Sequence, residues 1–323
     1  MTNEQLLSVE GLNVGFNTEQ GWVRVVEDVS FQLAAGEMLG LVGESGCGKS
    51  VTAQTVMRLL PSPPARIDGG RIIFEGEDLV VLPERRMRKI RGDRIGMIFQ
   101  EPMTSLNPTQ RIGRQIAEVL SLHRGLAYGE AKGLVIDVLN KVGIGNAERR
   151  LEQYPHELSG GLRQRVMIAM AIICGPKLLI ADEPTTALDV TIQAQIMELL
   201  KTLQRDLGLS ILLITHDLGV VAGMCRNMMV MYAGRIVERG PTAEIFAAPR
   251  HPYTAGLVSS SPRHARRGEL LPSIPGLVPP PGRRGAGCNF AERCPRAQEK
   301  CRREVPPLAL ASGRAAACWN PVP

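Results

Sequence analysis

A glycine-rich segment ending in lysine and serine is the first place where the residue types predict chemistry. Gly43-Glu-Ser-Gly-Cys-Gly-Lys-Ser50 follows the apolar run 37–42 and precedes a helix-like pattern over 49–60. Glycines let consecutive backbone N–H groups turn around an anion, and the helix start adds its positive end. The segment predicts a phosphate-binding loop, with a glycine-rich turn that carries a surface lysine as the alternative. The expected phosphate and Mg²⁺ contacts come from Gly43, Glu44, Ser45, Gly46, Cys47, Gly48, Lys49, Ser50 and Val51.

Two adjacent acids follow a second apolar run, 178–181. A carboxylate at the end of a parallel strand next to a phosphate loop is expected to hold Mg²⁺, directly or through water, and Asp182 takes this part. Glu183 lies one residue further and is expected to face the other way, where it can act as the general base for an attacking water. A plain exit from a strand into a turn is the alternative.

The elements that must position these residues alternate between strands and helices. Predicted strands cover 7–14, 23–31, 37–42, 71–74, 94–99, 178–181, 210–215 and 227–232. Predicted helices cover 49–60, 158–173, 191–207 and 217–225, and 110–143 is mostly helical in its periodicity. This alternation predicts an α/β fold in which helices flank a parallel sheet, with an antiparallel layer at the start.

Composition divides the chain near residue 240. The 323 residues are 44% hydrophobic and 22% charged, which excludes disordered, collagen-like and coiled-coil classes. Residues 1–240 hold 26 basic and 27 acidic residues, whereas 241–323 hold 12 and 5, together with 14 of the 23 prolines. We therefore predict a domain over 1–240 and an extension over 241–323. A basic extension fits nucleic acid, an anionic membrane surface or simple solubility.

Neither a leader nor a membrane span is expected. The first residues lack a basic and then apolar pattern, which gives no indication of secretion. The longest apolar stretch, 166–176, is shorter than the ~18 residues that a spanning helix requires.

A narrower pattern lies at Leu158-Ser-Gly-Gly-Leu-Arg-Gln-Arg165, which resembles the signature motif of ATP-binding cassette (ABC) ATPases. Ser159 precedes Asp182 by 23 residues, as the motif does in that family. Gln100 resembles the glutamine of the Q-loop, Thr186-Ala-Leu-Asp189 the D-loop, and His216 the switch histidine. The resemblance covers 7 to about 240. It implies a P-loop NTPase cassette with a RecA-like parallel sheet, an antiparallel β layer and a helical insertion at about 100–165.

The resemblance also implies a role for each matching residue. Ser159, Gly160 and Gly161 begin a helix whose N–H groups complete the ATP site of a second cassette. Ser50, Asp182 and Gln100 hold Mg²⁺, while Glu183 and His216 act on the attacking water and the γ-phosphate, and Asp189 belongs to the D-loop. Phe16 stacks on adenine or is a core residue. Leu162 departs from the pattern, because many cassettes carry glutamine there; the backbone contact is expected to survive.

The segment Pro249-Arg-His-Pro-Tyr-Thr254 and the Pro/Arg-rich run after it narrow the resemblance. They are similar to the C-terminal extension of oligopeptide/dipeptide importer ATPases, a branch that includes nickel and glutathione importers, and to its "D" type. This implies an ATPase that energises import from the cytoplasmic face of the bacterial inner membrane, as a peripheral protein. The implied partners are a second cassette of the paralogous "F" type, two transmembrane permease subunits and, indirectly, an extracytoplasmic solute-binding protein. The transported solute is not encoded in this chain.

Four cysteines of the extension, Cys288, Cys294, Cys301 and Cys318, have the spacing C-x5-C-x6-C-x16-C. This lacks the tight C-x2-C of common zinc ribbons and ferredoxins. Four thiolates in a proline-rich segment with little core still suggest a metal, and a reducing compartment disfavours disulfides. Extensions of this branch resemble 4Fe–4S-binding segments, so a 4Fe–4S cluster is expected, with zinc or unligated thiols as alternatives.

A rival function is a soluble cassette ATPase that acts on nucleic acid, in DNA repair or translation, through the basic extension. No long coiled coil interrupts the cassette, and the extension lacks the interleaved aromatic residues that stack on bases. Nucleic acid is therefore not expected as a partner. A redox-regulated switch at the cysteines would add to the importer function rather than replace it.

Overall fold

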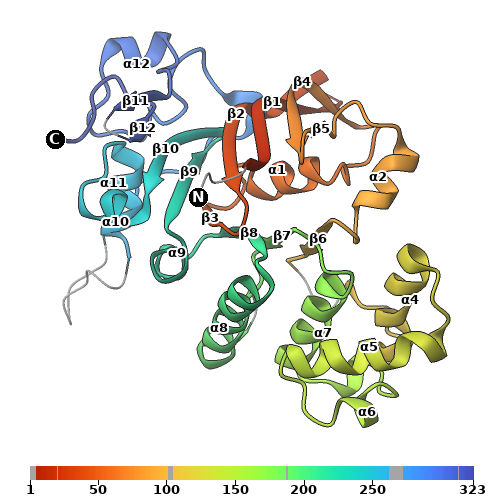
Figure 1. The fold of residues 1–323 in the computed structure, drawn as a ribbon. Coiled ribbons are helices and arrows are strands. Elements are labelled where there is room, and N and C mark those ends of the chain that lie inside the picture. Colours follow the sequence, from red (N-terminus) through yellow and green to blue (C-terminus); the bar gives the residue numbers. More distant parts are fainter. Residues whose placement is uncertain (1–4, 20, 101–104, 187, 262–271, 312) are drawn as a thin grey trace. The chain divides into compact units, whose positions relative to one another are not determined.

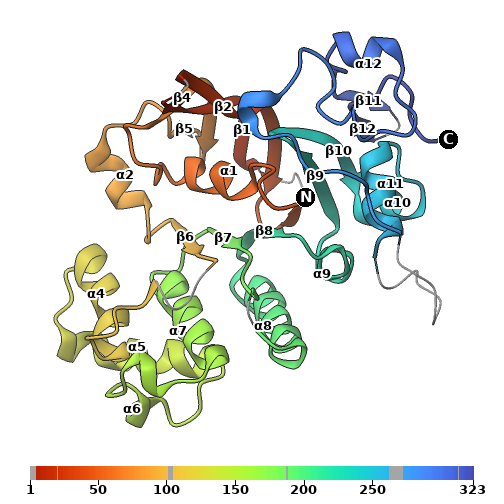
Figure 2. The same cartoon turned by 180° about the vertical axis from the view of Figure 1, so that it is seen from behind.

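The strand that leads into the phosphate loop, β3 (Met38–Val42), is buried along its whole length. The computed structural model describes residues 5–19, 21–100, 105–186, 188–261, 272–311 and 313–323. The chain divides into two units, one made mainly of 82–212 with 34–37, the other of 5–33, 38–81 and 213–323. Figure 1 shows the ribbon and Figure 2 the same ribbon from behind.

The first unit contains the helical segment and the strand that ends in Asp182. Its elements are α2 (Glu84–Ile90), β6 (Ile95–Ile98), α4 (Ile112–Arg124), α5 (Tyr128–Lys141), α6 (Ala147–Arg150), η1 (Pro155–Glu157), α7 (Gly160–Ile172), β7 (Leu178–Asp182) and α8 (Val190–Leu207). Strands β6 and β7 are parallel, and α7 packs against β6, α4, α5 and α8. The apolar side chains of α4 recur every three or four residues and are buried, which fixes that helix in the unit.

The second unit contains the phosphate loop and the extension. Its elements are β1 (Gln5–Thr18), β2 (Gly21–Ala34), β3, α1 (Lys49–Val56), β4 (Ala65–Phe74), β5 (Glu77–Asp78), α9 (Leu218–Met224), β9 (Asn227–Tyr232), β10 (Arg235–Pro241), α10 (Thr242–Ala247), α11 (Pro252–Ser259), η3 (Pro281–Arg283), α12 (Glu299–Arg303), β11 (Ala309–Ala311) and β12 (Arg314–Ala316). Strand β8 (Ser210–Thr215) begins in the first unit and ends in the second.

Two sheets form this second unit. One has the order β2-β1-β4-β5, in which β4 pairs antiparallel with β1 and with β5, which is the predicted antiparallel layer. In the other, β3 pairs in parallel with β9, β9 pairs antiparallel with β10, and the order continues through β12 to β11. The short strands of the extension therefore continue the sheet that carries the phosphate loop, as both views show.

A fully buried ion pair joins the extension to this sheet. Oε1 of Glu238 on β10 accepts from Nη2 of Arg314 on β12 at 2.9 Å and from the N–H of Arg250 at 2.9 Å. Oε2 accepts from the N–H of His251 at 2.9 Å. Because both carboxylate oxygens of Glu238 have partners, its buried charge is tolerated. Removing either Glu238 or Arg314 would leave the other charge buried and unpaired.

No helix among the described residues combines the length and the apolar character needed to cross a membrane.

Candidate nucleotide-binding site

The phosphate loop leaves β3 and enters α1 as predicted. Gly46 and Gly48 have positive φ angles of 77° and 109°, and Gly48 is the N-cap of α1. Gly43 is required for a different reason, because a Cβ there would collide with the backbone oxygen of Met231 on β9. The glycines thus permit the turn and its close approach to the neighbouring strand.

Lys49 is folded back over the loop that precedes it. Its Nζ donates to the backbone oxygens of Gly43 at 2.8 Å and Glu44 at 3.1 Å, and the residue is only 4% exposed. The Cys47 thiol of the same loop is buried, which raises its pKa. The ammonium is therefore held beside the helix start, where a nucleotide phosphate is expected to bind.

Glu44 has partners that the sequence did not predict. Its carboxylate is paired with Arg293, and its backbone N–H donates to the Tyr253 hydroxyl at 2.9 Å. Both partners belong to the extension. Tyr253 lies within the sequence segment 249–254 that indicated the importer branch, but nothing in the spacing of Arg293 predicted its contact with the loop.

The predicted general base lies in the first unit, where two side chains donate to it. Oε2 of Glu183 accepts from Nε2 of Gln100 at 3.3 Å and from Oγ1 of Thr186 at 2.8 Å. Glu183 has a left-handed φ of 47°, which is unusual for a residue with a side chain, and it is 8% exposed. Strained backbone of this kind is concentrated at functional sites. Asp182, the last residue of β7, is 2% exposed.

The signature segment begins a helix, as predicted. Ser159 is the N-cap of α7, and its Oγ accepts from the N–H of Leu162 at 3.4 Å. Asp189 is the N-cap of α8 and accepts from the N–H of Ile192 at 2.9 Å. A Cβ on Gly161 would lie 2.8 Å from Cγ2 of Ile192. The start of α7 therefore packs against the first turn of α8.

For the remaining predicted residues, the structure gives a position on their elements. His216 is exposed directly after β8, and Asp217 caps α9 by accepting from the N–H of Gly219 at 2.7 Å. Phe16 is half-buried on β1 opposite Ala65, a position compatible with either of its two interpretations. Parts of the Q-loop and D-loop segments, 101–104 and 187, lie outside the described residues.

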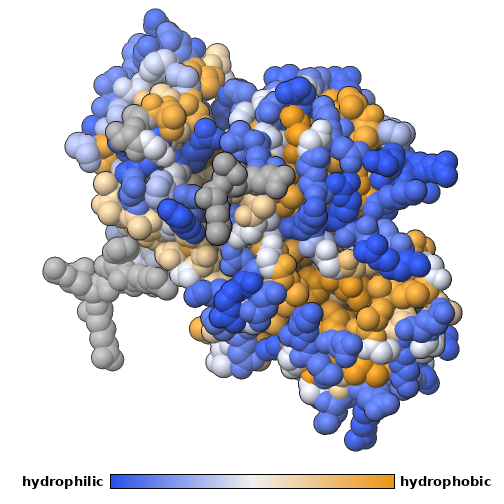
Figure 3. Space-filling view, in the orientation of Figure 1, coloured by the Kyte–Doolittle hydropathy of each residue, from blue (hydrophilic) through white to orange (hydrophobic). Residues whose placement is uncertain are grey.

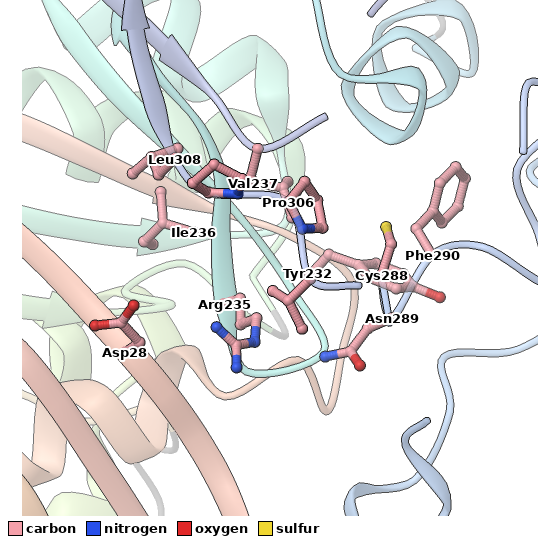
Figure 4. A pocket seen from close by; sticks show the side chains of 13 residues that line it. Asp28, Tyr232, Arg235, Ile236, Val237, Cys288, Asn289, Phe290, Pro306 and Leu308 are labelled. Atoms are coloured by element: carbon pink, nitrogen blue, oxygen red, sulfur yellow. The ribbon is translucent and has the colours of Figure 1, made fainter. Parts of the chain in front are cut away.

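The four cysteines of the extension are described, and they influence one another electrostatically. Burial is the largest effect and raises the pKa of Cys288 to about 11, and it also raises the pKa of Cys294 and Cys318. Each of these three sulfurs faces a backbone N–H two residues further along, which opposes the rise. A cavity of about 300 Å³ opens beside Cys288, between β10 and the loop 305–308 (Figure 4).

The expectation of a bound metal at these cysteines is not supported. Within the described part of the chain, no group of three or more His, Cys, Asp or Glu side chains is arranged to hold a metal ion.

Two family models match parts of this chain. Residues 26–186 match the family described as "ABC transporter", and residues 237–301 match "Oligopeptide/dipeptide transporter, C-terminal region". A protein of Sinorhizobium fredii named as a probable peptide ABC transporter ATP-binding protein is 53% identical over 317 residues, 98% of this chain and 95% of that protein.

Two solved structures share the cassette. The ATP-binding cassette MJ0796 in a dimeric, post-hydrolysis state bound to ADP and Pi is 25% identical, with a TM-score of 0.65 over 73% of this chain and 99% of that one. CbiO1 of Clostridium perfringens, part of the transporter complex cbiONQ, is 30% identical, with a TM-score of 0.64 over 76% of this chain and 91% of that one.

The buried strand, phosphate loop and capped signature helix define a nucleotide-binding cassette, and the predicted α/β cassette fold is confirmed. The chain belongs to the ATP-binding subunits of ABC transporters, in the family that carries the oligopeptide/dipeptide transporter C-terminal region. The sequence-based expectation of an ATPase of this branch is likewise confirmed.

Proposed function

We propose that this chain binds and hydrolyses ATP to energise a membrane importer of peptides or related small solutes. The observation that carries the proposal is the conjunction, in one chain, of a cassette and the oligopeptide/dipeptide transporter C-terminal region. The S. fredii relative, which is named for peptide transport, matches across both parts. The rival function on nucleic acid is not favoured by any of these observations.

In the proposed mechanism the loop amides and Lys49 bind the phosphates, while Ser50, Asp182 and Gln100 hold Mg²⁺. Glu183 takes the proton of the attacking water, and His216 orients the γ-phosphate. The hydrogen bonds from Gln100 and Thr186 to one Glu183 oxygen support this assignment, because they fix the carboxylate. ATP would be bound between this phosphate loop and the signature residues Ser159, Gly160 and Gly161 of a second cassette.

The helical segment of the first unit is the proposed contact with the permease subunits. Apolar side chains gather around α4, α5 and α7 in Figure 3. On these helices Leu122 is 75% and Leu134 48% exposed, which is high for leucine. An exposed apolar surface of this kind is typical of an interaction site. The other proposed partners are a paralogous "F" type cassette and, indirectly, an extracytoplasmic solute-binding protein, with this chain on the cytoplasmic face of the inner membrane.

A 4Fe–4S cluster at the four extension cysteines is a separate proposal. It is supported by the count of thiols and by the backbone N–H groups that face three of the sulfurs. Anaerobically purified protein is expected to be brown, with iron and sulfide in equal amounts. Colourless protein with stoichiometric zinc, or without any metal, would contradict the cluster.

The importer is tested by purifying the tagged full chain in mild detergent from its native membranes and identifying co-purifying proteins by mass spectrometry. Two polytopic membrane proteins and a second cassette are the expected result. Recovery of the Lys49→Ala variant with the same partners would show that assembly does not require ATP binding. Recovery of the wild type with nucleic acid or ribosomal proteins instead would overturn the transport function and keep the ATPase.

A further inference from the structure

The extension contacts the phosphate loop at Glu44. Nη1 of Arg293 lies 2.8 Å from Oε2 of Glu44, and Nη2 lies 3.0 Å from Oε1. The Tyr253 hydroxyl accepts the N–H of Glu44 at 2.9 Å, and Lys49 donates to the Glu44 backbone oxygen at 3.1 Å. The side chain and both backbone groups of Glu44 are therefore fixed, two of them by the extension.

Arg293 is itself rigidly placed. Its side chain is 6% exposed, its Nε donates to the backbone oxygen of Pro275 at 2.8 Å, and Nη2 approaches the backbone oxygen of Ile274 at 3.3 Å. Nη1 also reaches the Tyr232 hydroxyl at 3.3 Å. A bidentate guanidinium with its other donors occupied fixes a carboxylate in direction as well as in distance.

An aromatic cluster supports the contacts of Arg293 and Tyr253 with Glu44. The ring centroids of Tyr232 and Tyr253 are 4.5 Å apart, and the centroid of Phe290 lies 5.1 Å from that of Tyr232 and 5.4 Å from that of Tyr253. Tyr232 ends β9 in the cassette, whereas Phe290 lies three residues before Arg293. The packing thus joins the sheet to the loop that carries Arg293.

We propose that Arg293 and Tyr253 are positioning residues of the ATP site, which fix the main chain at Glu44 so that the following loop amides point at the phosphates. This inference rests on the proposed function, because it requires that the chain binds ATP. Since Tyr253 occupies the Glu44 N–H, that peptide serves as an anchor, and the amides after it form the phosphate cradle. The extension is thereby a part of the nucleotide site.

A second buried arginine of the extension provides a matched control. Nη1 of Arg284 pairs with Oε1 of Glu27 on β2 at 2.9 Å, and the Arg284 side chain is 4% exposed. This ion pair also joins the extension to the cassette, but within the described part of the chain no hydrogen bond or ion pair of Arg284 reaches the loop 43–50. If both arginines only hold the extension on the cassette, replacing either one should weaken ATP binding. If Arg293 positions the loop, only its replacement should do so.

The test measures ATP affinity and steady-state hydrolysis for the full chain and its purified complex. Arg293→Gln is expected to raise Kd and KM for ATP about tenfold, with kcat changed less than about twofold, within the usual range of coupling between sites. Tyr253→Phe keeps the ring packing and removes only the hydroxyl. It is expected to weaken ATP binding about threefold, the effect of one lost hydrogen bond. Arg284→Gln should leave Kd and KM for ATP unchanged.

A double-variant cycle completes the test. If Glu44 transmits the effect, Glu44→Gln combined with Arg293→Gln will weaken ATP binding no more than the stronger single variant. The inference is overturned if folded Arg293→Gln protein binds ATP as the wild type does, or if Arg284→Gln weakens binding equally. Failure of the wild type to bind ATP would instead overturn the proposed function.

Discussion

Nε2 of Gln100 donates to Oε2 of Glu183 at 3.3 Å, which joins two residues 83 positions apart. Thr186 donates to the same oxygen at 2.8 Å, so this carboxylate is oriented by its neighbours and by the left-handed turn at its own Cα. A general base must be oriented toward the proton that it removes, because proton transfer depends first on geometry and then on pKa.

Replacement of this carboxylate separates binding from hydrolysis. Glu183→Gln keeps the size of the side chain and removes its basicity. We expect ATP binding to persist while kcat falls about 10²- to 10⁴-fold, the usual contribution of general base catalysis. Hydrolysis in the assembled complex and binding of ATP measure the two effects separately. Undiminished hydrolysis would exclude Glu183 as the base.

Lys49 gives the complementary prediction. Because its buried ammonium stands at the phosphate loop, Lys49→Ala should lose most of its ATP affinity. ATP at about 100 times Kd stabilises a folded protein by about 2.7 kcal/mol, so the wild type should melt at a higher temperature with ATP. Thermal unfolding with and without nucleotide checks this. A variant that ATP still protects would count against the phosphate loop.

Local sequence patterns predicted most elements of the cassette, but not where they end. The helix expected over 49–60 stops at Val56, because Arg58 adopts a left-handed φ of 49° and prolines follow. The strand expected at 71–74 begins at Ala65, since β1 provides a long antiparallel partner. The short helices α2, α10 and α11 were not predicted, because each is stabilised by tertiary packing rather than by a long periodic pattern.

The site was predictable where it depends on local sequence. The loop glycines act within a few residues of their own positions, so their spacing identified them. Ser159 and Asp189 were expected from the family resemblance, and each caps the helix that follows it. The contact of Arg293 with Glu44 joins residues 249 positions apart and has no local signal. The metal expected at the extension cysteines is not supported by the described side chains, because cysteine spacing does not determine how the sulfurs are arranged in space.

The tight contact between α7 and α8 predicts that position 161 does not tolerate a side chain. Alanine usually stabilises a helix relative to glycine, but a Cβ on Gly161 meets Ile192 at 2.8 Å. Gly161→Ala should therefore lower the free energy of unfolding by about 1–3 kcal/mol, and Ile192→Ala should relieve that additional loss. Gly160→Ala is the control, because its Cβ would lie an ordinary 3.4 Å from Leu188. Equal stability of the two alanine variants in urea denaturation would show that the packing is loose.

Acid sensitivity is expected from a histidine buried in the extension. His251 is 1% exposed, its Nδ1 accepts from the N–H of Tyr253 at 3.1 Å, and burial lowers its pKa to about 3. In the unfolded chain this imidazole takes up a proton near pH 6.5, whereas in the folded protein it stays neutral at that pH. Between these two pKa values the unfolded state binds more protons, so the stability that is fully present above pH 6.5 is lost as the pH falls.

The expected loss from His251 is about 1.4 kcal/mol in the free energy of unfolding for each pH unit below 6.5. His251→Asn keeps an acceptor at the N-cap of α11 but does not titrate in this range. Urea denaturation of both proteins at pH 7.5, 6.0 and 5.0 measures the two slopes. The variant should be less stable than the wild type at pH 7.5 yet lose less on acidification, because it has no buried imidazole to protonate. Parallel slopes would mean that His251 is protonated equally in both states and that the acid response arises elsewhere.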